Sequence, residues 1–160
     1  MQAVAATPFA VLTAVVAPAI LTNASSVLAL GTSNRVARVV DRTRIVAKEL
    51  AAMEPGSMHY ASWTKQLERL QVRARLLVRA LRLFYVSLGL FATSALIAVI
   101  GSVVSFSGRT DLADLAAGIG LLTGAIAVGG LAWGCALMVN ETRLAIRNLA
   151  EEASIQNYRP

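Results

Sequence analysis

The stretch of sequence that decides the fold runs from Gly31 to Leu83 and reads GTSNRVARVVDRTRIVAKELAAMEPGSMHYASWTKQLERLQVRARLLVRALRL. It holds eleven of the fifteen basic residues of the chain and only four acidic ones, which leaves seven positive charges. Long apolar runs without charge lie on both sides of it. Basic segments beside membrane spans remain on the cytoplasmic side. The sequence therefore predicts a cytoplasmic segment between two membrane spans.

The composition also indicates a membrane protein. Hydrophobic residues make up 56% of the chain and charged residues only 15%, whereas soluble domains contain about 25% charged residues. The net charge of +6 accompanies no nucleic-acid-binding motif and flanks the apolar runs, so we expect no nucleic acid partner. The single cysteine, Cys135, can form no disulfide within the chain.

Three runs are long enough to cross a bilayer, which takes about 20 apolar residues. They are residues 9–30, 83–106 and 115–139, and none contains a charged residue. No Lys or Arg precedes the first run, which argues against a cleaved signal peptide. We predict an all-α integral membrane protein, a single membrane domain over residues 1–160, with three transmembrane helices and its N-terminus outside.

The segment between the first two spans, residues 34–82, has helical periodicity on both sides of a turn at Pro55-Gly56. Apolar residues recur at alternating spacings of three and four, as in a coiled coil. The first arm has Val36, Val40, Thr43, Ala47 and Leu50, and the second has Leu67, Leu70, Ala74, Leu77, Leu81 and Phe84. We predict a cytoplasmic antiparallel helical hairpin over residues 34–82, and an amphipathic cytoplasmic tail over residues 140–160.

Two of the spans carry small or hydroxylated faces. In span one these residues are Pro18, Thr22, Ser25 and Ser26. They are interpreted either as a hydrated face or as a surface for close helix packing, and packing is favoured because no ionisable residue accompanies them.

Span three has small residues on two opposed faces, and each face admits a close helix neighbour. The predicted packing residues are Gly120, Gly124, Gly129, Gly130 and Gly134. Gly120 and Gly124 lie on one face and Gly129 on the other. Because spans one and two can occupy only one of these faces, we expect the protein to associate with a further helix.

Arginines also gather where the three spans reach the predicted cytoplasmic surface. The members of this arginine collar are Arg35, Arg38, Arg79, Arg82, Arg143 and Arg147. Only Asp41 and Glu141 lie near enough to neutralise them. The collar is interpreted either as a topology signal alone or as a contact for anionic lipid headgroups or an acidic partner.

Nothing in the sequence indicates catalysis. The spans contain no Asp, Glu, His, Lys or Arg, and no nucleophile with a base or metal-ligand cluster is present. The only histidine, His59, lies outside the spans, which argues against a haem ligated by histidine. We expect no enzymatic activity, no catalytic residues, no metal and no cofactor.

The chain also resembles a known family. The residues that carry the resemblance are Pro18, Asn34-Arg35, Arg38 and Asp41-Arg42-Thr43-Arg44, followed by two further spans that end in Glu141 and a short tail. The pattern is similar to a bacterial family of small membrane proteins, domain of unknown function 2721, over roughly Phe9 to Leu149. The resemblance implies a three-span protein of the bacterial inner membrane and no particular reaction.

Two functions agree with these features. The first is a structural or interaction protein that self-assembles, or docks as a small subunit on a larger membrane complex, through its glycine faces and basic hairpin. The second is an oligomeric channel or passive pore lined by the polar face of span one. Burial of that face against protein favours the first function, and its exposure along a water-filled axis favours the second.

Overall fold

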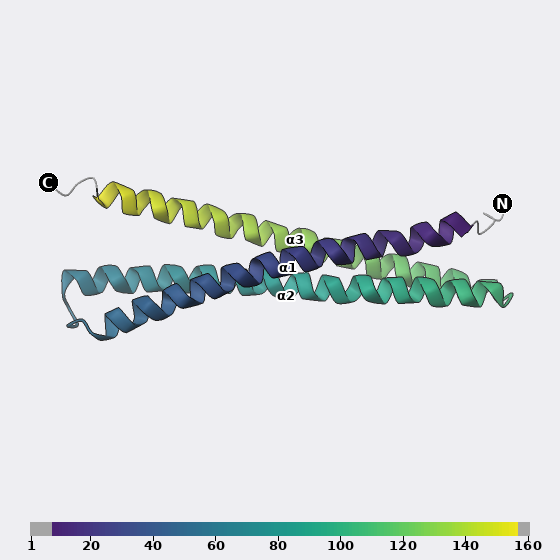
Figure 1. Cartoon of the computed structure of the whole chain (residues 1–160), viewed down its shortest axis with the longest axis horizontal. Helices are drawn as coiled ribbons and strands as arrows, with labels where there is room; N and C mark the ends of the chain where they lie inside the picture. The colour runs from purple at the N-terminus through teal and green to yellow at the C-terminus, as the bar shows by residue number, and fades with distance from the viewer. Residues whose placement is uncertain (1–7, 157–160) are drawn as a thin grey trace. The chain divides into compact units, whose positions relative to one another are not determined.

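The computed structural model describes residues 8–156, and the side chains of residues 16–147 apart from Met58. Over residues 8–156 it contains three helices and no strand: α1 (Pro8–Ala51), α2 (Met58–Phe106) and α3 (Thr110–Gln156) (Figure 1). Each helix includes a stretch long and apolar enough to cross a membrane. The all-helical prediction is thereby confirmed. The last residues of the predicted tail, 157–160, lie outside the described residues.

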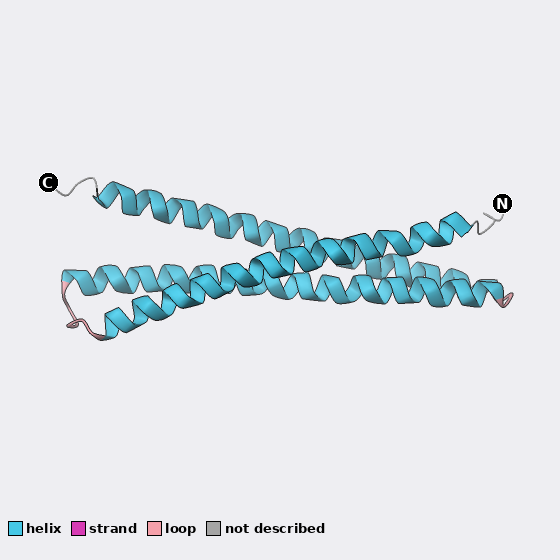
Figure 2. Cartoon of the chain, viewed as in Figure 1, coloured by secondary structure: helices cyan, strands magenta, loops and turns pink. Residues whose placement is uncertain are grey.

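The helices are interrupted at two short connections, drawn as loops in Figure 2. Gly56 (φ 97°) and Gly108 (φ 77°) adopt the left-handed conformation that glycine tolerates best, which explains why the chain turns there. The backbone N–H of Tyr60 donates a 3.1 Å hydrogen bond to Ser57 Oγ, so Ser57 caps the first turn of α2. The second connection consists of residues 107–109, since α2 ends at Phe106 and α3 begins at Thr110.

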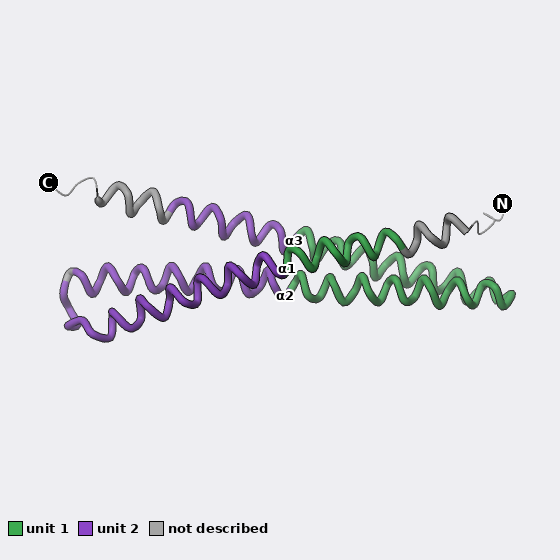
Figure 3. The backbone as a smooth tube through the Cα atoms, viewed as in Figure 1, with its two compact units in different colours: residues 1–29, 83–132 green, residues 30–82, 133–160 purple. Residues whose placement is uncertain are grey.

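The chain divides into two compact units, coloured separately in Figure 3. Unit 1 consists of Met1–Ala29 and Leu83–Ala132, and unit 2 of Leu30–Arg82 and Trp133–Pro160. Each helix therefore contributes one segment to each unit. Most of the residues of the predicted spans belong to unit 1, whereas the whole predicted hairpin belongs to unit 2.

In unit 1, α2 buries a row of alternating large and small side chains. Phe84, Ser87, Phe91 and Ser94 follow one another at spacings of three and four, and each is at most 8% exposed. The hydroxyl of Ser94 donates a 2.8 Å hydrogen bond to the carbonyl oxygen of Gly120 on α3. Small residues and hydroxyl groups at helix contacts are typical of membrane helices, where backbones pack closely.

In unit 2 the buried row becomes aliphatic. The core consists of Val39 and Val46 of α1 with Leu70 and Leu77 of α2. Partly buried apolar residues pack against this core, namely Val36, Trp63, Leu67, Ala74 and Met138. The second arm thus uses the face that its sequence predicts.

In the first arm, two of the five predicted core positions are shifted by one residue. Val39 is buried in place of Val40, and Val46 in place of Ala47. Val39 is 7% and Val46 0% exposed, whereas the predicted Ala47 is exposed. The predicted and observed rows share Val36, Thr43 and Leu50, so both satisfy a spacing of three and four. The observed row places Val46 in the core in place of the smaller Ala47, which buries more apolar surface.

Candidate functional site

Glu141 is the most deeply buried charged residue among those described in unit 2. It follows the last uncharged run of α3 by two residues and is only 2% exposed. Small residues precede it at intervals of seven, and Gly120, Ala127 and Gly134 are all buried. Two helical turns are close to seven residues, so Glu141 falls on the covered face of α3. An ionised carboxylate at such a position needs charged or hydrogen-bonding partners.

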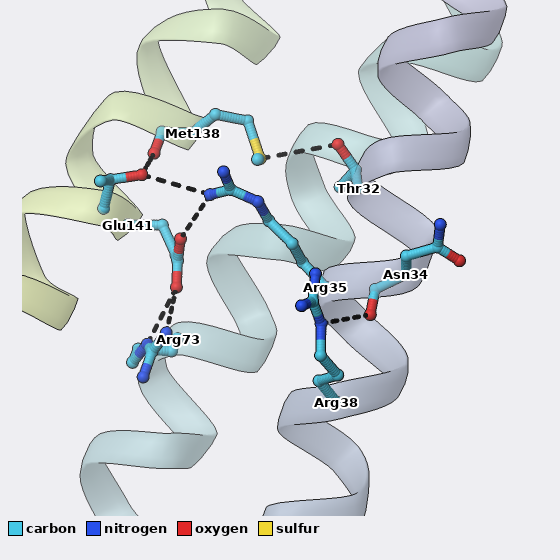
Figure 4. A network of polar contacts seen from close by, with 8 residues as sticks. Thr32, Asn34, Arg35, Arg38, Arg73, Met138 and Glu141 are labelled. Carbon is cyan, nitrogen blue, oxygen red and sulfur yellow. Dashed lines mark hydrogen bonds and ion pairs between the residues drawn. The ribbon is translucent and has the colours of Figure 1, made fainter.

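Two arginines from the other helices provide these partners (Figure 4). Arg73 of α2 donates a 2.9 Å hydrogen bond from Nε to Glu141 Oε1, and its Nη2 forms an ion pair with the same oxygen at 2.8 Å. Arg35 of α1 places Nη1 at 3.6 Å from Oε2, and the same nitrogen donates a 3.3 Å hydrogen bond to Thr142 Oγ1. One residue from each helix therefore meets at this point, which we call the Arg–Glu–Arg cluster (Arg35, Arg73 and Glu141).

Neighbouring polar contacts orient the members of the cluster. The Thr142 hydroxyl donates to the carbonyl oxygen of Met138 at 3.0 Å, which leaves its lone pairs for Arg35. Thr32, 2% exposed on α1, donates a 3.6 Å hydrogen bond from its hydroxyl to Met138 Sδ. Figure 4 draws this contact as a dashed line. Arg38 Nε donates at 3.3 Å to the carbonyl oxygen of Asn34. Thr32 and Arg35 thus connect α1 to α3, whereas the contact of Arg38 lies within α1.

A cavity of about 370 Å³ opens beside the cluster, within the volume range of small-molecule sites. Its lining consists of Arg35, Arg38, Val39, Arg73, Glu141, Thr142 and Ala145. Three guanidinium groups face one carboxylate there, so the lining keeps two positive charges. Such a surface attracts anions.

The structure places the predicted arginine collar in two groups. Arg35 and Arg38 line the cavity. The others, Arg79, Arg82, Arg143 and Arg147, are exposed and do not line it. Arg73 was not predicted from the sequence, although a signal for it exists. It follows the buried Leu70 by three residues and precedes the buried Leu77 by four, so it belongs to the covered side of α2.

The five glycines that were predicted to pack against other helices differ in how far they are covered. A Cβ atom on Gly120 would lie 3.4 Å from Ile97 Cγ2, one on Gly124 3.4 Å from Ser94 Oγ, and one on Gly130 2.7 Å from Ser87 Oγ. Gly134 is buried. A Cβ atom on Gly129, in contrast, would meet no described heavy atom within 4 Å. Four of the five glycines therefore lie at covered positions, and Gly129 lies on an open one.

The polar face of α1 is mostly covered by protein. Ser25 is fully buried, Thr22 and Pro18 are partly buried, and Ser26 is exposed. Pro18 lines a second cavity, of about 690 Å³, within unit 1. The walls of this cavity are mainly apolar, and the hydroxyl of Ser94 among them already bonds to Gly120. We regard the charged cavity as the better candidate because it brings several polar groups together.

The charged site has the chemistry to recognise an anion. Among the described side chains, no three metal-ligating residues of the types His, Cys, Asp and Glu gather at one place. The cluster offers guanidinium donors fixed by a carboxylate, which suits an oxyanion.

Comparison with known proteins places the chain beside an uncharacterised family. A family model described as a protein of unknown function, DUF2721, matches residues 15–151. Neither the search of curated proteins nor that of solved structures returned a match.

Proposed function

This chain belongs to the DUF2721 family, whose description gives no function, and we propose that it is a non-enzymatic membrane protein that acts by association. In this proposal the three apolar stretches anchor it in the membrane. The basic residues of unit 2 place the segment between the first two spans, and the C-terminus, in the cytoplasm. The membrane is then the inner membrane of a bacterium, as the family resemblance implies.

The observation that carries the proposal is the unequal covering of the two faces of α3. Gly120, Gly124 and Gly130 face side chains of α2, whereas Gly118 and Gly129 meet no described atom within 4 Å. Ala125, Ala132 and Ala136, on the same side as Gly129, are exposed too. We call this surface the open face of α3. A face of small residues allows close contact with another helix in a bilayer.

A second copy of the chain is the partner that we propose for this face. Two copies of a flat surface of small residues complement each other about a two-fold axis, since each presents what the other requires. Bulky exposed residues beside the face, including Ile126 and Trp133, can then pack around the contact. Docking on a different membrane protein would use the same face and is the alternative outcome of the test below.

The pore hypothesis receives no support from the polar face of span one. Its most central hydroxyl residue, Ser25, is fully buried within the described chain. Burial against protein is the arrangement that close packing requires.

The test compares Gly129→Leu with a control, Leu122→Ala, in lipid nanodiscs. Leu122 is 63% exposed and lies two helical turns before Gly129, at the edge of the open face, and its replacement by the smaller alanine adds no bulk there. We expect wild type and Leu122→Ala to be dimers or larger by mass photometry, and Gly129→Leu to be mostly monomer because its side chain separates the two faces. Monomers for all three, with no accompanying protein after mild extraction, would refute the proposal. Co-extraction of one other protein, lost in Gly129→Leu, would assign the face to that partner.

A further inference from the structure

The charged cavity in unit 2 carries more positive charge than its ion pair needs. One arginine is enough to neutralise Glu141, yet Arg35, Arg38 and Arg73 all line the space. Arg73 makes the two short contacts with the carboxylate, while Arg35 approaches it only to 3.6 Å. Glu141 neutralises one of the three charges, and the two that remain repel each other unless a further anion is bound. The lining therefore suits a ligand with at least one negative charge.

Arg38 supplies the donors for such a ligand. Its Nε is held by the carbonyl oxygen of Asn34, one turn earlier on α1, which fixes the plane of the guanidinium group. Among the described residues, its terminal nitrogens have no protein acceptor in hydrogen-bond range. A planar guanidinium group with two parallel donors matches the oxygens of a phosphate, and lysine does not offer this geometry.

Measured from the ends of the predicted spans, the cavity lies at the depth where a bilayer has its lipid phosphates. Arg35 follows Leu30, the end of the first predicted span, by five residues, and Glu141 follows Val139 by two. At 1.5 Å per residue these steps are roughly 8 Å and 3 Å. The polar layer on each side of the hydrocarbon is about 5 to 8 Å deep. Both residues thus lie at the depth of lipid headgroups.

We propose that this cavity binds one phosphate group, from an anionic lipid headgroup or as a soluble ion, through Arg35 and Arg38 with Arg73 alongside. Glu141 acts as a positioning residue that holds Arg73 and Arg35 in place. The volume of about 370 Å³ accommodates a headgroup. The proposal is independent of the association through α3, since none of its residues lies on the open face.

The experiment uses the full chain in nanodiscs of phosphatidylcholine, titrated with phosphatidylglycerol in one arm and with inorganic phosphate in the other. Binding is measured by native mass spectrometry of retained lipid and by the shift of the thermal unfolding midpoint. We expect one molecule of phosphatidylglycerol to be retained by wild type. In Arg38→Gln we expect binding about fivefold weaker, because each basic residue near an anionic surface contributes about that factor.

Two further variants separate a site from general surface charge. Arg42→Gln removes the same charge one turn along α1, at an exposed residue that does not line the cavity, and we expect it to bind as wild type does. Ala145→Leu leaves the charge unchanged and fills the cavity, so we expect it to lose the lipid. This variant also tests the proposal if Arg38→Gln fails to fold.

The outcomes are distinct. If wild type binds phosphatidylglycerol more strongly than inorganic phosphate, and Ala145→Leu loses this binding, the cavity is a lipid site. If wild type binds only inorganic phosphate, and Ala145→Leu loses that binding, the cavity holds a soluble anion. An equal reduction in Arg38→Gln and Arg42→Gln, with Ala145→Leu unaffected, would overturn the proposal. So would the absence of binding by wild type in both arms.

Discussion

Gly130 of α3 and Ser87 of α2 approach each other closely inside unit 1. A Cβ atom on Gly130 would lie 2.7 Å from Ser87 Oγ, and this hydroxyl is buried without a hydrogen-bond partner among the described residues. The absence of a side chain at Gly130 is therefore what lets the two helices meet here. The small size of the residue matters at this position, and its conformational freedom does not.

We predict that Gly130→Ala lowers the free energy of unfolding by about 1 kcal/mol, because an added methyl group overpacks the contact. Gly89→Ala is the matched control, since Gly89 lies on α2, away from the open face of α3, and a Cβ there meets nothing within 4 Å. It should leave stability unchanged or raise it by about 0.5 kcal/mol, as alanine favours a helix over glycine. The measurement is thermal unfolding in mild detergent. Adding Ser87→Ala to Gly130→Ala should restore stability, and equal effects at both glycines would contradict this account.

The ion pair of Glu141 gives a second expectation for a single side chain. In Arg73→Leu the carboxylate stays buried with only the more distant Arg35 beside it, so we expect a loss of about 3 kcal/mol. Arg75→Leu, at an exposed neighbour, should change stability by less than about 0.5 kcal/mol. Because an apolar replacement of a whole buried pair is often tolerated, Arg73→Leu with Glu141→Leu should be more stable than Arg73→Leu alone. Equal melting of Arg73→Leu and Arg75→Leu would show that the pair contributes nothing.

Along α2 a single buried row changes its composition from unit 2 to unit 1. Leu70 and Leu77 occupy it in unit 2, and Phe84 and Phe91 continue it in unit 1 at the same spacing of seven, with Ser87 between them. The period is that of a helix packed against neighbours throughout. The proposed topology, with unit 1 in the bilayer and unit 2 in the cytoplasm, gives a reason for this change. Aliphatic burial stabilises a contact where water is the alternative surroundings, whereas close approach matters more in lipid.

We predict a large effect of Leu77→Ala, since Leu77 is 0% exposed in the core of unit 2. The cavity left behind should cost about 3 kcal/mol. Val78→Ala, at the next residue and 44% exposed, serves as control and should cost less than about 0.5 kcal/mol. Trp63 packs against this core, so thermal unfolding followed by tryptophan fluorescence measures both variants, in chains that carry Trp133→Phe so that Trp63 alone reports. A similar loss in the two variants would mean that the helices are packed in another register.

The helices and their breaks were predictable because local chemistry determines them. Pro55-Gly56 and Gly108 interrupt the chain where glycine takes a positive φ, and the apolar runs set the lengths. The register of α1 was not predictable, because Val39 and Val40 satisfy the helical periodicity equally well. Only the greater apolar surface of Val46 over Ala47 separates the two rows.

The charged site was predictable only in part. Arg35, Arg38 and Glu141 stand out because they flank the spans. The pairing of Arg73 with Glu141 joins residues 68 positions apart, and it depends on how α2 and α3 are rotated about their axes. Arginines recur every few residues on α2, so the sequence alone does not distinguish the one that faces α3.

For the chain as a whole, the charge asymmetry predicts the topology. The seven surplus positive charges of residues 31–83 should keep that segment on the cytoplasmic side, with the N-terminus outside and the C-terminus inside. Reporter fusions after Met53 and after Pro160 should both give a cytoplasmic signal. A fusion after Arg109, in the connection between α2 and α3, is the control and should report the outside. A periplasmic signal after Met53 or Pro160 would refute this orientation.

The location of Glu141 in the third helix has a consequence for how the chain is made. Synthesis proceeds from the N-terminus, so Arg35 and Arg73 leave the ribosome before the carboxylate that joins them. Until α3 has emerged, α1 and α2 hold these arginines without that acid. The ion pair can therefore form only late in translation. A chain truncated before residue 141 lacks the carboxylate and leaves the charges of Arg35 and Arg73 uncompensated.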